Sequence, residues 1–211
     1  MKPTARAAAA LLALIAWIAL LIQFGVTSDI QGSLAATLWA LLWYFTITTN
    51  LLVAIVFTTL AIKPAAIHPS LIACTTLNIL LVGIIYALLL HGLTELSGDS
   101  AIANFLLHMV TPILVPIFWL IFTPKGHLTR RDPLLWTIYP FIYFSYALIR
   151  GEFTHRYPYP FMNVNILGWS HTLLNAVIIA IAFLITGWLF VWLDTLLARR
   201  TTRPNTLHQS S

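Results

Sequence analysis

The chain has 211 residues, of which 60% are hydrophobic and only 8% are charged. A soluble domain carries about 25% charged residues, so this composition excludes an ordinary water-soluble domain. The formal net charge is +5, but the basic residues form no cluster of the kind that a nucleic-acid-binding domain presents. Nucleic acid is therefore not an expected partner.

Six long runs without charge follow one another along the chain. An α-helix needs ~17–25 mainly apolar residues to cross ~30 Å of hydrocarbon, and backbone polar groups in lipid must be bonded within the chain. The sequence therefore predicts an all-α, polytopic membrane protein with six transmembrane helices, at residues 7–26, 34–61, 70–91, 101–122, 132–150 and 170–197. Residues 1–200 should form a single domain, and the polar residues 201–211 a disordered C-terminal tail.

The first run follows Lys2 and Arg6 and is longer than the ~7–15 apolar residues of a secretory signal, so we expect a helix rather than a cleaved peptide. Lys and Arg gather in the two terminal segments and in the loops after the second and fourth runs, whereas only Arg150 and Arg156 fall on the other side. An excess of basic residues marks the cytoplasmic side. Both termini are therefore expected in the cytoplasm, with the chain in the plasma (inner) membrane.

The second predicted span carries a polar cluster, Tyr44-Phe45-Thr46-Ile47-Thr48-Thr49-Asn50. In a continuous helix Thr46 and Asn50 share a face near the middle, and Trp39 and Trp43 extend that stripe. A single threonine in such a helix usually bonds the preceding carbonyl, and an asparagine usually joins neighbouring helices. Three hydroxyls and an amide together mark a candidate site.

The third span holds Cys74, the single cysteine, so an intramolecular disulfide and a cysteine-based metal site are excluded. The fourth span places Asn104, His108, Pro112 and Pro116 at four-residue spacing on one face. Pro112 has no N–H for the carbonyl of His108, so we expect a kink and a free carbonyl beside the imidazole. Such a histidine is either satisfied by Asn104 or a neighbouring helix, or it serves catalysis or ligation.

The fifth span carries aromatic residues at helical spacing, Trp136, Tyr139, Tyr143 and Tyr146. Two of them, Tyr139 and Tyr143, lie too deep for an interfacial belt alone, so they either line an amphipathic cavity or pack between helices. Beyond this span comes Tyr157-Pro158-Tyr159-Pro160-Phe161. Two prolines among three aromatics predict a stiff cap over the non-cytoplasmic mouth of the bundle, or else an interfacial loop.

Three elements occur in a recognisable order: the Tyr44 to Asn50 segment, Asn104-x3-His108-x3-Pro112, and Leu148-Ile149-Arg150-Gly151 followed by the Tyr-Pro-Tyr-Pro-Phe run. Over nearly the whole chain they resemble the bacterial predicted six-transmembrane family, which is distantly similar to the animal androgen-induced and androgen-dependent membrane proteins. Those proteins are intramembrane threonine hydrolases of fatty acid esters of hydroxy fatty acids. The resemblance implies Thr46, or Thr48 or Thr49 if the alignment shifts, as nucleophile and His108 as base.

In the implied reaction, His108 takes the proton of the Thr46 hydroxyl, and an acyl-threonine forms and is hydrolysed. Asn50, Asn104 and Tyr143 are candidate donors to the oxyanion. Tyr86, Arg150, Asn163 and His171 are expected to bind substrate or support the site. Asn163 stands where related sequences carry an acid, so this chain either lacks the function or uses Asn163 by hydrogen bonding alone. The expected partner is a membrane lipid, and no metal or cofactor is expected.

Two other functions remain open. Four of the seven histidines, namely His91, His108, His155 and His171, fall on one side and allow a haem or metal redox protein, although haem usually needs facing pairs at matched depth. A transporter or lipid-binding scaffold without chemistry would also use proline-broken helices. Against an ion-coupled carrier, no charged residue lies deep inside a predicted span.

Overall fold

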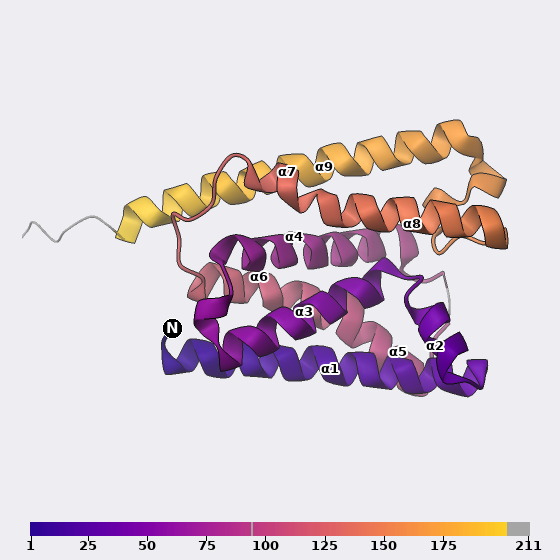
Figure 1. Cartoon of the computed structure of the whole chain (residues 1–211), viewed down its shortest axis with the longest axis horizontal. Coiled ribbons are helices and arrows are strands. Elements are labelled where there is room, and N and C mark those ends of the chain that lie inside the picture. The colour runs from indigo at the N-terminus through magenta and orange to yellow at the C-terminus, as the bar shows by residue number, and fades with distance from the viewer. Residues whose placement is uncertain (94, 202–211) are drawn as a thin grey trace, which may run out of the picture.

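The computed structural model describes residues 1–93 and 95–201, without the side chains of Arg200 and Thr201. The predicted tail lies outside these residues from residue 202 onward. The described chain is helical and contains no strand. Its helices run side by side along one long axis (Figure 1).

The first half of the bundle contains α1 (Pro3–Gln31), α2 (Leu34–Leu41), α3 (Phe45–Ile62) and α4 (Pro69–Ile85). A π-helical turn, η2 (Tyr86–Leu90), extends α4, and a short turn, η1 (Pro64–Ala66), precedes it. The long helix α1 packs mainly against α3. Its contact face is a row of buried alanines, Ala5, Ala9, Ala13, Ala16 and Ala19, because small side chains let two helices approach closely without loss of packing.

The second half contains α5 (Gly98–Phe105), α6 (Thr111–Phe122), α7 (Asp132–Trp136), α8 (Ile138–Thr154) and α9 (Val164–Thr201). Another π-helical turn, η3 (Leu106–Val110), joins α5 to α6, and η4 (Pro160–Met162) precedes α9. Figure 1 shows α8 and α9 along one side of the bundle, and α4 contacts α9. At the crossing of α4 and α6, a Cβ on Gly83 would stand 2.7 Å from Pro112 Cβ, so only glycine permits this approach.

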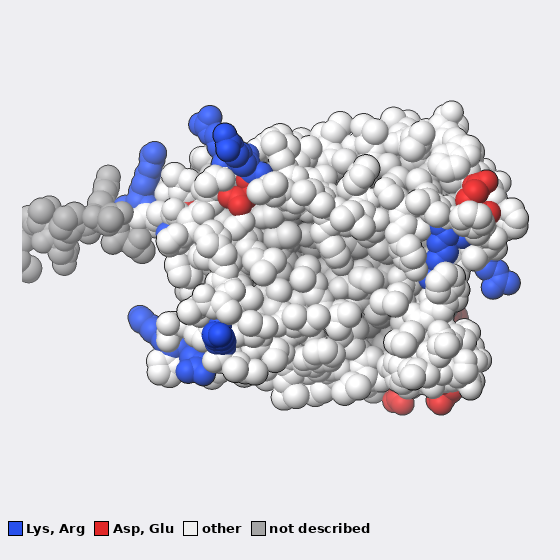
Figure 2. Space-filling view, in the orientation of Figure 1, with Lys and Arg blue, Asp and Glu red and all other residues white. Residues whose placement is uncertain are grey.

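Five helical segments are long and apolar enough to cross a membrane: Pro3–Gln31, Phe45–Ile62, Pro69–Leu90, Gly98–Phe122 and Val164–Arg199. The predicted fifth span, 132–150, is divided into α7 and α8, and the longer piece has only 17 residues. Figure 2 shows the charged side chains at the two ends of the bundle and a wide uncharged band between them. Large apolar side chains face outward in this band, among them Leu21, Ile121 and Trp192, each more than 60% exposed.

The prediction of one continuous helix over 34–61 is wrong. The chain leaves the helix at Leu42–Tyr44, and Tyr44 is extended (φ −98°, ψ 128°) before α3 begins at Phe45. The break is held by tertiary contacts, because Tyr143 Oη donates to the carbonyl of Trp43 at 2.7 Å. The predicted shared stripe of Trp39, Trp43 and Thr46 therefore does not exist, since Trp39 belongs to α2.

Candidate active site

Thr46 lies in the first turn of α3, rather than in the middle of a helix as the sequence predicted. Its Oγ1 atom lies 3.2 Å from Nε2 of His108. His108 belongs to the π-helical turn η3. Thr46 is buried, with 6% of its surface exposed. The break before α3 is thus what brings this hydroxyl to the end of a helix and against the imidazole.

The imidazole of His108 is held in one tautomer. Its Nδ1 atom lies 3.1 Å from the carbonyl oxygen of Asn104. Because a carbonyl only accepts, Nδ1 carries the proton, and Nε2 presents its lone pair to the Thr46 hydroxyl. This is the protonation pattern that a general base for Thr46 requires. Asn104 bonds His108 through its backbone carbonyl, whereas the sequence pattern pointed to its side chain.

Tyr86 packs against one face of the His108 imidazole. Its phenol stacks on the His108 imidazole, with 4.4 Å between the ring centroids and 29° between the planes. Asn104 Nδ2 donates to the Tyr86 hydroxyl at 2.7 Å, so the side chain of Asn104 holds Tyr86 while its carbonyl holds His108. Tyr86 and Asn104 therefore orient the base.

Asn50 joins the two elements that carry Thr46 and His108. Its Nδ2 donates to the carbonyls of Thr46 (2.9 Å) and Leu107 (3.2 Å), and its Oδ1 accepts from Thr111 Oγ1 (2.7 Å). Both amide hydrogens are used, so Asn50 has none left for an oxyanion. It acts instead as a positioning residue between α3 and η3.

A second carbonyl beside the base, that of Leu107, accepts hydrogen bonds from side chains. The side chains of Asn50 and Thr111 both bond the Leu107 carbonyl, not that of His108. The local cause is the π-helical turn, in which Thr111 N bonds the carbonyl of Leu106. The π-helical partner of the Leu107 carbonyl would be residue 112, and Pro112 has no N–H. This carbonyl therefore accepts from side chains.

Thr48 and Thr49 are not in contact with the imidazole. Tyr139 Oη donates to Thr48 Oγ1 at 3.0 Å, and it lies 3.2 Å from Thr49 Oγ1. Both hydroxyls thus face α8, while Thr46 faces His108. Among the three threonines of the cluster, Thr46 alone has a base beside it.

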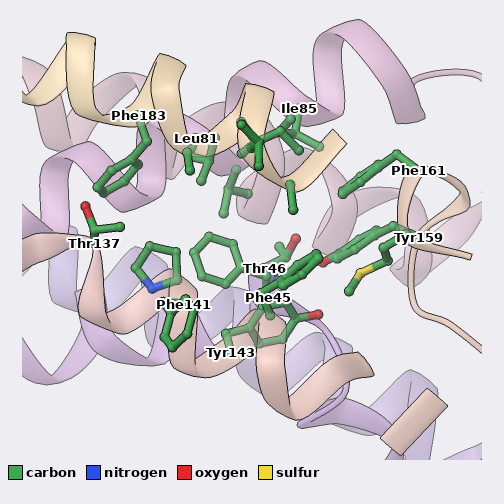
Figure 3. A pocket seen from close by; sticks show the side chains of 18 of the residues that line it. Phe45, Thr46, Leu81, Ile85, Thr137, Phe141, Tyr143, Tyr159, Phe161 and Phe183 are labelled. Carbon is green, nitrogen blue, oxygen red and sulfur yellow. Dashed lines mark hydrogen bonds between the residues drawn. The ribbon is translucent and has the colours of Figure 1, made fainter. Parts of the chain in front are cut away.

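A cavity of about 500 Å³ opens against Thr46. Its wall is almost entirely apolar and comes from α3, α4, α8, α9 and the loop before α9, with Leu81, Ile85, Phe141, Phe144, Val177 and Phe183 among its residues. Figure 3 shows Thr46 toward the end that holds Tyr159 and Phe161, and Phe183 and Thr137 at the opposite end. The volume and the apolar wall suit a hydrocarbon chain, with a few polar groups at one end.

Tyr159 belongs to the site, although the sequence pattern predicts it only as part of the cap formed by residues 157–161. The cap folds inward at this residue, so that Tyr159 is 9% exposed and stacks on Phe161 at 5.2 Å. The backbone N–H of Thr46 donates to the Tyr159 hydroxyl at 3.4 Å, and Figure 3 shows the ring reaching from its loop toward Thr46. Burial raises the pKa of Tyr159, so the phenol keeps its proton at neutral pH and remains a donor.

The remaining predicted site residues lie elsewhere. Tyr143 lines the cavity, but its hydroxyl is engaged with the Trp43 carbonyl. Arg150 lies near the end of α8, where its guanidinium stacks on Trp39. Asn163 Oδ1 accepts from the N–H of Asn165, and His171 Nδ1 bonds the Leu167 carbonyl, so neither meets His108.

Within the part of the chain that the structure describes, no group of three or more His, Cys, Asp or Glu side chains is placed to hold a metal ion. No protein-family model matches the chain, and comparisons with curated proteins and with solved structures find no significant match. The function of this chain is therefore inferred from the geometry of this site.

Proposed function

We propose that this chain is an intramembrane hydrolase that cleaves long-chain lipid esters, with Thr46 as nucleophile and His108 as general base. The observation that carries this proposal is the 3.2 Å contact between Thr46 Oγ1 and His108 Nε2 at the wall of an apolar cavity of about 500 Å³. Fatty acid esters of hydroxy fatty acids, which the resemblance implies as substrates, are one class of long-chain ester.

The fold also supports a proposal for the membrane arrangement. We infer six spans, because α7 and α8 together continue from residue 132 to residue 154 beside the five longer segments. Basic residues near the start of α1, after α6 and near the end of α9 lie at one end of the bundle (Figure 2), which supports a cytoplasmic position of both termini in a plasma membrane. Thr46 then opens toward a chamber that acyl chains reach from the bilayer.

The first half of the reaction forms an acyl-threonine. His108 Nε2 accepts the proton of Thr46 while Oγ1 attacks the ester carbonyl, and the carbonyl oxygen becomes an oxyanion. The Tyr159 hydroxyl, which lies against the Thr46 backbone, is the donor to that oxygen, and the positive end of α3 favours its charge. The carbon–oxygen bond to the alcohol then breaks, and His108 returns the proton to the leaving alkoxide.

The second half releases the fatty acid. Water gives a proton to His108 Nε2 as its oxygen attacks the acyl-threonine carbonyl. The bond to Thr46 Oγ1 breaks, and Oγ1 takes the proton back from His108. Asn104 holds the imidazole through Nδ1 in every step, and Asn50 keeps α3 and η3 at a fixed distance.

Activity on a long-chain ester tests the proposal directly. Purified protein in detergent should hydrolyse a long-chain ester and release the free acid, whereas an ester with a two-carbon acyl group should react much more slowly because it leaves the cavity empty. The measurement is steady-state release of acid for both esters. A protein that takes up long-chain esters without cleaving them would instead be a lipid-binding scaffold or transporter.

Tyr159→Phe tests the oxyanion donor. Loss of one such donor should lower kcat by ~10²–10³-fold and leave KM nearly unchanged, because the hydrogen bond strengthens only in the transition state. Tyr157→Phe is the matched control, since the Tyr157 hydroxyl bonds Glu152 on the surface. Equal effects of the two substitutions would exclude a specific role for Tyr159.

A further inference from the structure

Arg150 is a cation buried near the non-cytoplasmic end of α8. Only 5% of its surface is exposed. Within the described part of the chain, no carboxylate lies within 4.0 Å of its guanidinium. A buried charge without a counter-ion is strongly unfavourable, so the surroundings of Arg150 must explain its presence.

Aromatic rings lie against the guanidinium. Its Cζ atom lies 3.8 Å from the centroid of the Trp39 ring and 4.5 Å from that of Trp43. Nη1 donates to the Tyr146 hydroxyl at 2.7 Å. Rings stacked on a planar cation leave its N–H groups pointing outward in the plane, which is where an anion binds.

Two donors in this cluster have no acceptor. Nε of Arg150 and Nε1 of Trp43 are both buried and without a hydrogen-bond partner. A purely structural contact between α2 and α8 would account for the rings against the guanidinium. It would leave both N–H groups without an acceptor. Stacking on aromatic rings also returns less free energy than burial of the charge costs. An anion that accepts from both donors removes both deficits.

We propose that the cluster of Arg150, Trp43, Trp39 and Tyr146 binds the anionic end, a carboxylate or a phosphate, of an amphiphile whose chain lies toward the Thr46 cavity. Arginine suits such a group because its fork of N–H donors matches two oxygens at once. Trp39, which is 58% exposed, forms the outer wall and is the side chain that gives way when the anion arrives.

The distance along α8 connects this cluster to the cavity. Tyr143 lines the cavity and bonds the backbone of Trp43, and Tyr146 is the next aromatic residue toward Arg150. Seven residues of helix separate Tyr143 from Arg150, which is ~10 Å at 1.5 Å per residue. One extended amphiphile therefore spans both places, with its charge at Arg150 and its hydrocarbon beside Thr46.

The test measures binding in a protein that cannot consume its ligand. In a Thr46→Ala background, equilibrium binding of radiolabelled oleate and of its neutral methyl ester is compared in detergent micelles. Oleate should bind at least ~10-fold more tightly than the methyl ester, and Arg150→Gln should remove that preference without changing binding of the ester, because hydrogen bonds to a charged group are lost. Arg156→Gln, at an exposed arginine of the same region, should leave the preference intact.

Each other result overturns the proposal. If the Thr46→Ala protein with Arg150 intact binds oleate and methyl oleate equally, or if Arg156→Gln removes the preference for oleate as Arg150→Gln does, the cluster only joins α2 to α8. Inorganic phosphate that binds alone and displaces oleate would show a site for free anions rather than for an amphiphile. If Arg150→Gln does not fold, the Thr46→Ala chain with Arg150 intact decides, since oleate must then raise its Tm more than methyl oleate does. Because no step needs hydrolysis, failure of ester cleavage would leave this result interpretable.

Discussion

Thr46→Ala is expected to reduce hydrolysis of a long-chain ester by at least ~10³-fold, to the level that binding and oxyanion stabilisation alone provide. The substitution removes the oxygen that attacks the ester and leaves the cavity wall and His108 in place. Thr46→Ser keeps the hydroxyl but not the methyl group that limits χ1, so it should cost only about threefold, one rotamer among three. The measurement is kcat/KM for each variant.

Thr49 offers a matched control for this experiment. It is also a buried threonine of α3, but its hydroxyl lies against Tyr139 rather than His108. Thr49→Ala should therefore lower the unfolding temperature in detergent modestly and retain most of the activity. If Thr46→Ala stays active, or if Thr49→Ala loses as much, Thr46 is not the nucleophile.

His108→Gln is expected to lower kcat by ~10²–10⁴-fold, the usual contribution of a positioned general base. Glutamine retains a polar side chain on η3 but cannot take a proton from Thr46. The size of the loss should depend on the leaving group. A p-nitrophenyl ester needs no proton to depart, so its loss should be smaller than that of an alkyl ester, for which His108 also acts as the acid.

His171 provides the comparison for His108. It is exposed at the start of α9 and bonds only the backbone of Leu167. His171→Gln should leave both esters unaffected. An equal loss on both esters in His108→Gln, together with a lowered unfolding temperature, would assign His108 a structural role.

The position of Thr46 within its helix differs from the prediction. Thr46 does not sit inside a helix, where its hydroxyl would bond the carbonyl one turn back. It stands in the first turn of α3, where the N–H of Thr46 itself lacks an intrahelical acceptor and bonds Tyr159. The same helix end thus supplies the nucleophile and holds the Tyr159 hydroxyl beside it.

The structure brings together the two side chains that the resemblance implies, Thr46 and His108. The candidate oxyanion donors, in contrast, came from residue types alone. Asn50 was expected to stabilise an oxyanion, yet both its amide hydrogens bond carbonyls. Tyr159 lay in the cap motif without a role, yet its hydroxyl is the polar group beside the Thr46 backbone. These errors have one origin, since hydrogen-bond partners distant in sequence leave no trace in local spacing.

The sequence by itself determined where most helices form and where the charges lie. Apolar runs long enough to cross a bilayer must bond their own backbone, so hydropathy alone predicted a helix in the region of each of the five long segments. It did not predict the break before Phe45. The basic residues likewise marked one end of the bundle before its helices were placed. These properties depend on neighbours in the chain, and the amino-acid order states them directly.

Only the tertiary structure decided the site. The break at Leu42–Tyr44 is held by Tyr143, 100 residues away from the carbonyl that it binds. Thr46 meets His108 across 62 residues and Tyr159 across 113. The cavity exists because α4, α8 and α9 leave a space in front of Thr46. Such contacts depend on how helices pack against one another, and apolar runs of nearly equal hydropathy do not specify which faces meet.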